Sequence, residues 1–251
     1  MKRQKAKSKS NTVVIGVIPA RYGSTRLPAK ALAMIHGKPM IQHVYERCLK
    51  AKLLSEVLVA TDDKRIFDAV INFGGNVVMT SKTHKSGTDR IGEAIKNIKC
   101  DVVVNIQGDE PMIAPDNIDK AIKPLIQDKS INVATLCISI SDKKEISNPN
   151  VVKVVLDSNS NALYFSRSVI PFNRDTTKSE YFKHIGLYVY RKDYLMKLIK
   201  MKPSRLELTE KLEQLRVLES GQKIKVIETE IESYSVDTPA DLRKIRKLIK
   251  S

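Results

Sequence analysis

The sequence has 251 residues, of which 42% are hydrophobic and 29% charged, with three widely spaced cysteines. This apolar content suffices for one large α/β domain without disulfides, and the cysteine spacing matches neither a metal site nor a redox motif. The net charge is +16, and residues 1–11 contain five basic residues and no acid. We therefore expect a flexible basic tail over 1–11 and a single domain over 12–251.

The first apolar run, 13–18, is too short for a signal peptide and is followed at once by Pro19 and Arg21. No stretch approaches the roughly 20 apolar residues of a membrane-spanning helix. These features predict a cytoplasmic protein without stable membrane association. The positive charge would suit an anionic substrate. Nucleic acid is an alternative ligand, although no aromatic platform typical of RNA binding is apparent.

Short β-branched runs alternate with helical patterns in the first half of the chain. The pattern predicts strands at 13–18, 57–60, 77–79 and 102–106, and helices at 39–52, 64–73, 88–97 and 115–127. This alternation indicates a three-layer, Rossmann-like α/β fold with a mostly parallel sheet and helices on both faces.

The pattern changes in the second half. Strands are expected at 133–140, 151–156, 162–166, 185–190 and 224–227, and helices at 194–200, 207–219 and 239–249. No helix separates the strands at 151–156 and 162–166, so the polar turn between them predicts a hairpin-like ribbon. We interpret the region of about 133–182 as an inserted β-rich element that supplies a lid or a dimer contact.

A loop rich in cations follows the first predicted strand. Arg21, Arg26 and Lys30 lie there within ten residues, and no P-loop signature is present. Ligands of open α/β sheets bind at the carboxyl ends of the strands, where such cations can hold a polyphosphate. A solvated basic loop is the alternative interpretation.

Acidic residues occur at two other places where the predicted elements meet the same edge. Asp109 follows the strand at 102–106, and Asp237 precedes the last helix. Two carboxylates from distant parts of the chain suit a Mg²⁺ ion that bridges phosphates. Either carboxylate could instead cap a turn or a helix.

Ten segments, in order and spacing, closely resemble the family of 3-deoxy-manno-octulosonate cytidylyltransferases. They extend over nearly the whole chain, from about 13 to 248. The segments are 18–30, 36–41, 60–62, 86–90, 105–112, 148–153, 162–167, 184–188, 212–216 and 236–239. The resemblance implies a nucleotidyltransferase fold in which the inserted β element helps to form a homodimer.

The resemblance also implies an activity. The family transfers CMP from CTP to the anomeric hydroxyl of the acid sugar 3-deoxy-manno-octulosonate (KDO), releases pyrophosphate, and so activates KDO for lipopolysaccharide synthesis. Lys30, Asp109 and Asp237 would be catalytic, with Asp109 and Asp237 holding Mg²⁺. Further residues would bind CTP (Arg21, Lys30, Ser86, Gly87, Arg90 and Gln107) or KDO (Arg167, His184, Tyr188, Glu213 and Gln214).

Two departures from the family pattern stand out. The family usually has glycine and proline where this chain has Ala29 and Ala31. Ala29 is poorly suited to a positive φ, so CTP affinity or the loop would change if the family geometry requires one. Ala240 replaces a common acidic residue, at little expected cost. A related acid sugar, such as amino-substituted KDO or a sialic-type acid, remains an alternative substrate, whereas a non-catalytic nucleic-acid binder is a distant one.

Overall fold

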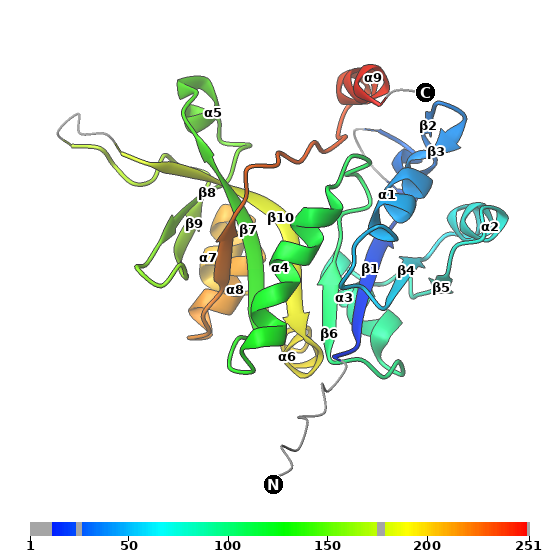
Figure 1. The fold of residues 1–251 in the computed structure, drawn as a ribbon, viewed down its shortest axis with the longest axis horizontal. Coiled ribbons are helices and arrows are strands. Elements are labelled where there is room, and N and C mark those ends of the chain that lie inside the picture. The colour runs from blue at the N-terminus through cyan, green and yellow to red at the C-terminus, as the bar shows by residue number, and fades with distance from the viewer. Residues whose placement is uncertain (1–11, 24–26, 175–178, 250–251) are drawn as a thin grey trace, which may run out of the picture.

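The computed structural model describes residues 12–23, 27–174 and 179–249 (Figure 1). The expected basic tail and Arg26 lie outside these ranges. Nine strands of the described residues form one sheet, in which β11-β7-β10-β6-β1-β4-β5 is the main order, β8 pairs with β10 and β9 with β8. They are β1 Val14–Ala20, β4 Glu56–Thr61, β5 Val77–Met79, β6 Val102–Asn105, β7 Val133–Ile140, β8 Lys153–Leu156, β9 Ala162–Ser166, β10 Tyr181–Arg191 and β11 Lys225–Glu228.

The sheet is mostly parallel, as predicted. β1 runs parallel to β4 and β6, β4 to β5, and β7 to β11, whereas β10 is antiparallel to its neighbours. Within the region 133–182, β7 belongs to the main sheet between β11 and β10, whereas β8 and β9 form an antiparallel ribbon that projects from it (Figure 1).

Helices cover both faces of the sheet, which gives three layers. Buried side chains of α1, α2 and α4 pack on one face, and those of α3, α6 and α8 on the other. The helices are α1 Met40–Cys48, α2 Lys64–Asn72, α3 Gly87–Ile95, α4 Pro115–Gln127, α5 Lys143–Ser147, α6 Lys192–Leu198, α7 Arg205–Glu210, α8 Gln214–Glu219 and α9 Pro239–Leu248, with a 3₁₀ turn, η1, at Lys30–Leu32.

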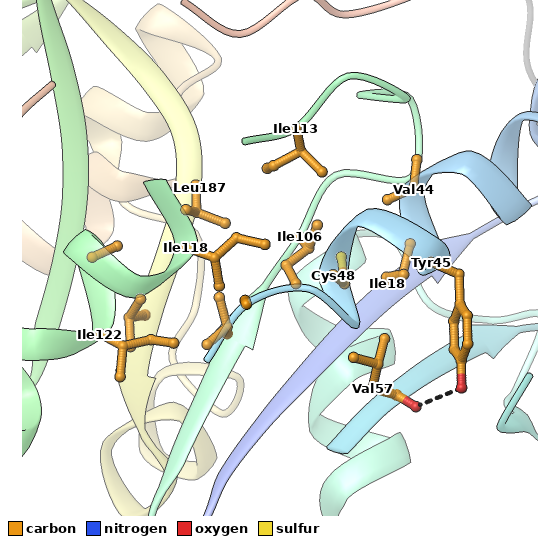
Figure 2. Packing of buried hydrophobic residues seen from close by; sticks show 14 of the residues in the cluster. Ile18, Val44, Tyr45, Cys48, Val57, Ile106, Ile113, Ile118, Ile122 and Leu187 are labelled. Carbon is orange, nitrogen blue, oxygen red and sulfur yellow. Dashed lines mark hydrogen bonds between the residues drawn. The ribbon is translucent and has the colours of Figure 1, made fainter. Parts of the chain in front are cut away.

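The core under α1 and α4 fixes the strands that carry the site (Figure 2). Ile118 of α4 lies beside Ile106, which directly follows β6, and Cys48 of α1 lies near Ile18 of β1. All four side chains are completely buried. Because packing of this kind tolerates little displacement, the ends of β1 and β6 are held in place relative to each other.

Two local predictions need correction. The expected single helix over 207–219 is in fact two helices, α7 and α8, because Lys211 has a left-handed backbone with φ 56° that ends α7. The expected helix from residue 39 is preceded by an unpredicted hairpin of β2 (Met34–Ile35) and β3 (Lys38–Pro39), whose turn residues His36 and Gly37 both have positive φ.

Candidate active site

Three side chains from distant parts of the chain meet at the carboxyl edge of the sheet. The Nζ atom of Lys30 lies 2.5 Å from Oδ2 of Asp109 and 3.1 Å from Oδ1 of Asp237. Lys30 begins η1, Asp109 follows β6, and Asp237 immediately precedes the N-cap of α9. The convergence expected from the order of the elements is therefore present.

Neither carboxylate caps a helix. Thr238 caps α9 by accepting from the backbone N–H of Asp241, and Ala114 occupies the N-cap of α4. The backbone N–H of Val236 donates to the carbonyl of Asp109 at 2.8 Å. This bond ties the segment before α9 to the loop after β6, so that the two carboxylates are held side by side.

The charge of Lys30 is stabilised in this position. Burial alone would lower the pKa of Lys30, but the charges and hydrogen bonds of Asp109 and Asp237 outweigh it, and the pKa lies above its usual value. The ammonium therefore remains protonated at neutral pH, and it lies between the two carboxylates.

The donor set fits a magnesium ion that is shared with a nucleotide. Mg²⁺ is usually bound by one or two protein carboxylates together with substrate phosphates, rather than by an all-protein cage. Asp109 and Asp237 already share one cation, the Lys30 ammonium, so their oxygens are close enough to share another. Over the described ranges, no group of three or more His, Cys, Asp or Glu side chains forms a metal cage.

The three residues line a polar cavity of about 380 Å³. Most of the remaining lining comes from the loop after β1, the start of α3 and the loop after β6. The lining residues are Pro19, Ala20, Arg21, Lys30, Ala31, His84, Lys85, Ser86, Gly87, Arg90, Gln107, Gly108, Asp109 and Asp237. All six residues expected to contact CTP are in this set, and Arg21 is exposed at its edge.

Close backbone approach shapes this cavity. A Cβ atom on Gly108 would lie 3.0 Å from the carbonyl oxygen of Pro19, so a larger residue would force the end of β1 and the loop after β6 apart. Ser86 caps α3 by accepting from the N–H of Asp89 at 3.1 Å, and Gly87 opens that helix at the cavity wall. Partial positive charge at a helix N-terminus favours an anionic ligand.

Two of the polar residues in the cavity are already held by protein partners. Arg90 is almost completely buried, and its guanidinium lies 2.7 Å from Oδ2 of Asp62 and also donates to Thr80. The Gln107 amide donates to the carbonyl of Gly186 at 3.1 Å. These contacts fix both side chains before any ligand binds.

A second cavity of about 170 Å³ adjoins the first and shares Pro19, Gly87 and Gln107 with it. Tyr188, Glu213 and Gln214 line it. Its other lining residues are Thr88, Asn105 and Tyr190.

Buried polar groups line this second cavity. The Tyr188 hydroxyl and Oδ1 of Asn105 have no hydrogen-bond partner within the described part of the chain. Burial raises the pKa of Glu213, although hydrogen bonds from Thr88 and Ser86 and the charge of Arg216 act against the shift. Buried polar atoms without partners are costly, and here they indicate a place for a polar ligand.

His184 does not line this second cavity but a third one, of about 520 Å³, and its ring contacts Tyr188 of the second. Its ring centroid is 5.2 Å from that of Tyr188 and 5.1 Å from that of Phe165. Burial lowers the pKa of His184 to about 3, so the imidazole is neutral at physiological pH. Its Nε2 atom lies 3.0 Å from Oγ1 of Thr135, whose hydroxyl is 2.8 Å from the carbonyl of Leu187. Because a carbonyl only accepts, the Thr135 hydroxyl donates to it, and Nε2 of His184 carries the proton.

Arg167 is not brought to either cavity. Its Nε atom donates to the carbonyl of Glu210 at 2.8 Å and its Nη1 atom to the carbonyl of Pro149 at 3.1 Å. Among the five residues expected to bind KDO, Arg167 thus lies apart, whereas Tyr188, Glu213 and Gln214 line one cavity and His184 contacts Tyr188.

Sequence reasoning missed several lining residues. Tyr190 lies two residues after Tyr188, and the period of a strand would have placed both on one face. His84 and Lys85 directly precede Ser86, and their position before a predicted helix was a usable signal. Asn105 begins the segment 105–112, but its place in the cavity depends on burial that only the folded chain creates.

The fold and the cavity together define a three-layer α/β protein with a polar cavity at the carboxyl edge of its sheet. A family model described as "Cytidylyltransferase" matches residues 15–224. The chain therefore belongs to the cytidylyltransferase family.

Its place within that family is with the 3-deoxy-manno-octulosonate cytidylyltransferases, which confirms the resemblance of the ten segments. A protein of that name from Geobacter metallireducens is 56% identical over 243 residues, covering 92% of this chain and 96% of the relative. A second protein of that name, from Geotalea daltonii, is 53% identical over 248 residues, covering 94% of this chain and 98% of the relative.

A solved structure agrees in fold and sequence. It is described as CMP:2-keto-3-deoxy-manno-octonic acid synthetase complexed with CTP, and it matches this chain with a TM-score of 0.91 and 47% identity, covering 94% of this chain and 98% of that one. As for membranes, the helices within the described ranges are all too short or too polar to cross a bilayer.

Proposed function

We propose that this protein transfers CMP from CTP to the anomeric hydroxyl of KDO and releases pyrophosphate. The observation that carries the proposal is the meeting of Lys30, Asp109 and Asp237 beside two adjoining polar cavities. The names of relatives with more than half of their residues identical support KDO over an amino-substituted or sialic-type acid.

The reaction is an in-line displacement at the α-phosphorus of CTP. The bond between the anomeric oxygen of KDO and the α-phosphorus forms as the bond to the bridging α–β oxygen breaks, and pyrophosphate leaves with that electron pair. The hydroxyl proton is lost to solvent or to a phosphate oxygen. Positioning and charge stabilisation supply the acceleration in such reactions, and no covalent enzyme intermediate is required.

In the larger cavity, Arg21 and Lys30 would contact the triphosphate, because both cations line this cavity together with the two carboxylates. Gly87 and Ser86 at the start of α3, with Gln107 and Arg90, would contact ribose and cytosine. Asp109 and Asp237 would hold Mg²⁺, which when bound neutralises phosphate charge. The fixed positions of Arg90 and Gln107 reduce the ordering cost of nucleotide binding.

In the smaller cavity, Tyr188, Glu213, Gln214 and the adjacent His184 would bind the acid sugar. A neutral His184 offers the sugar hydroxyls a hydrogen bond rather than a charge. Arg167 is the remaining expected contact, and it would have to leave its carbonyl partners to reach the sugar.

The test is a three-component assay. Pyrophosphate should appear only when CTP, Mg²⁺ and KDO are all present, and a panel of acid sugars should show KDO as the preferred acceptor. Asp109→Ala should reduce turnover by at least about 10³-fold with an unchanged circular dichroism spectrum, since it removes a carboxylate from the reacting phosphates. The surface variant Asp68→Asn is the matched control. Near-normal CMP-KDO formation by Asp109→Ala would remove this residue from the site.

The same proposal extends to the setting of the enzyme. A cytoplasmic location would give it access to CTP, and its product would feed lipopolysaccharide synthesis. A homodimer formed through the β8–β9 ribbon is supported by apolar side chains on and after the ribbon, where Leu163 is 61% exposed and Phe172 86% exposed. Exposed apolar groups of this kind mark interaction surfaces.

A further inference from the structure

Hydrogen bonds join the β2–β3 hairpin to helix α9, away from the carboxylates of Asp109 and Asp237. Nε2 of His36 lies 2.6 Å from the carbonyl oxygen of Arg246. In return, Nε and Nη2 of Arg246 donate to the carbonyl of Met34 at 3.0 and 2.7 Å. We call this reciprocal set of bonds, made by Met34, His36 and Arg246, the hairpin–α9 clamp. The segment 36–41 was singled out in the sequence, yet none of its residues lines either cavity.

The chemistry of the clamp is specific to a helix end. The last carbonyls of an α-helix have no partner within the helix, and Arg246 is in the last turn of α9. Because this carbonyl can only accept, His36 donates from Nε2. The turn that presents His36 is tight, with φ 44° at His36 and 79° at Gly37, so the imidazole starts from a fixed backbone.

The two elements that the clamp joins, the hairpin and α9, each adjoin a residue expected to be catalytic. The hairpin is preceded directly by η1, which begins with Lys30, and α9 is preceded by Asp237. Between these points, α9 buries only Leu242 and Ile245, which pack with Ile35 and other residues of a small cluster. On its other side, Asp237 follows Val236, which is buried in the same cluster and bonded to the carbonyl of Asp109. A helix of this length spans about 15 Å, so rotation of α9 about its apolar contact would turn the Asp237 side chain about the Val236 anchor and away from Lys30. Figure 1 shows α9 lying beside the hairpin.

We infer that the hairpin–α9 clamp positions the Asp237 carboxylate against Lys30 and Asp109, and that His36 and Arg246 are therefore positioning residues of the magnesium–nucleotide site. The inference rests on the proposed function for its metal readout. Its structural readout, the mobility of the segment that carries Asp237, is independent of that function.

The experiment compares three variants of the full chain. His36→Asn retains a residue that tolerates positive φ but is too short to reach Arg246. Arg246→Ala removes the return bonds. Arg243→Ala is the matched control, an exposed arginine of the same helix for which the described residues provide no hydrogen-bond or ion-pair partner. Each variant is titrated with Mg²⁺ in the presence of CTP by calorimetry, without KDO, and amide hydrogen exchange is followed by mass spectrometry.

The expected result is a rise in the Mg²⁺ dissociation constant of about three- to tenfold for His36→Asn and Arg246→Ala, the loss that one or two hydrogen bonds correspond to. Exchange should accelerate in the peptide covering 236–242, and Arg243→Ala should match the parent chain. Unchanged exchange in that peptide, or acceleration spread over the whole chain, would overturn the inference. If the parent chain binds no Mg²⁺ with CTP while the local exchange effect persists, the proposed function fails and the clamp stands.

Discussion

At the scale of single residues, the loop that carries Lys30 contains a strained backbone. Ala29 has φ 53° and ψ 30°, and its N–H donates to the carbonyl of Tyr22 at 3.2 Å. The sequence raised the question whether this loop requires a positive φ at Ala29, and it does. Alanine adopts this conformation at a cost in free energy. The Cζ atom of Arg65 lies 3.2 Å from the centroid of the Tyr22 ring, and this cation–π contact helps to hold the loop.

Replacing this residue should relieve the strain. Ala29→Gly is expected to raise the free energy of unfolding by roughly 0.5–1 kcal/mol, because glycine adopts the left-handed region freely and the gain exceeds its entropic cost. Ala31→Gly is the control, since Ala31 is buried within η1 and should lose stability instead. Urea denaturation of both variants measures the difference, and equal losses would show that the Ala29 backbone is unstrained.

His184 gives a pH dependence. Its pKa is about 3 in the folded chain and about 6.5 when unfolded. The unfolded state therefore binds more protons between these values, and stability should rise with pH across that window. When the pH falls from 6.5 to 5, the free energy of unfolding should therefore drop by about 1–2 kcal/mol less in His184→Gln than in the parent chain. Chemical denaturation at both pH values checks this, and parallel losses would contradict it.

The residues of the site were partly predictable for a physical reason. Asp109 and Lys30 follow strands that are neighbours in a parallel sheet, so their meeting follows from topology. The place of Arg167 does not follow, because its partners are backbone carbonyls of Pro149 and Glu210 that no side-chain pattern reveals.

At the scale of elements, the bounds of α4 and β7 agree with the sequence pattern to the residue. Strong apolar periodicity and a proline at the first turn explain this success. The break between α7 and α8 was not predictable, because a lysine with positive φ carries none of the signal that glycine gives. The β2–β3 hairpin was missed because each strand has two residues, too few to show alternation.

The junction of α7 and α8 depends on one ion pair. Oε1 of Glu207 lies 2.5 Å from Nη2 of Arg216, and the two side chains are only 12% and 10% exposed, respectively. Glu207→Gln should lower the free energy of unfolding by about 2–3 kcal/mol, because it removes the carboxylate that is hydrogen-bonded to a largely buried arginine. Asp68→Asn breaks the pair with Lys64, whose side chain is 82% exposed, and should change stability by less than about 0.5 kcal/mol. Similar losses in both variants, measured in urea, would refute this account.

At the scale of the whole molecule, the sequence pattern predicted the class and layers correctly because strand and helix periods differ strongly. It could not distinguish the sheet strand β7 from the projecting ribbon of β8 and β9. Both consist of β-branched and apolar residues, and only the pairing partners differ.

The ribbon provides the prediction at this scale. A double variant, Leu163→Thr with Phe172→Ser, should convert the proposed dimer of 28.3 kDa chains into monomers, because it removes exposed apolar area that the interface would cover. Ile71→Thr with Met79→Thr is the control, since these residues are also exposed, at 54% and 47%, but lie on α2 and β5. Sedimentation analysis decides the outcome, and a parent chain that is already monomeric would exclude the dimer.

The bond between Lys30 and Asp237 joins residues 207 positions apart. Among the described helices and strands, α9 is the last that a ribosome would release, because synthesis proceeds from the N-terminus. With Asp237 in its proposed role, a growing chain would already display Lys30 and Asp109, yet would remain inactive until α9 docks. Newly made protein should gain turnover only after α9 has docked on the completed sheet, so that no partly built copy would consume nucleotide.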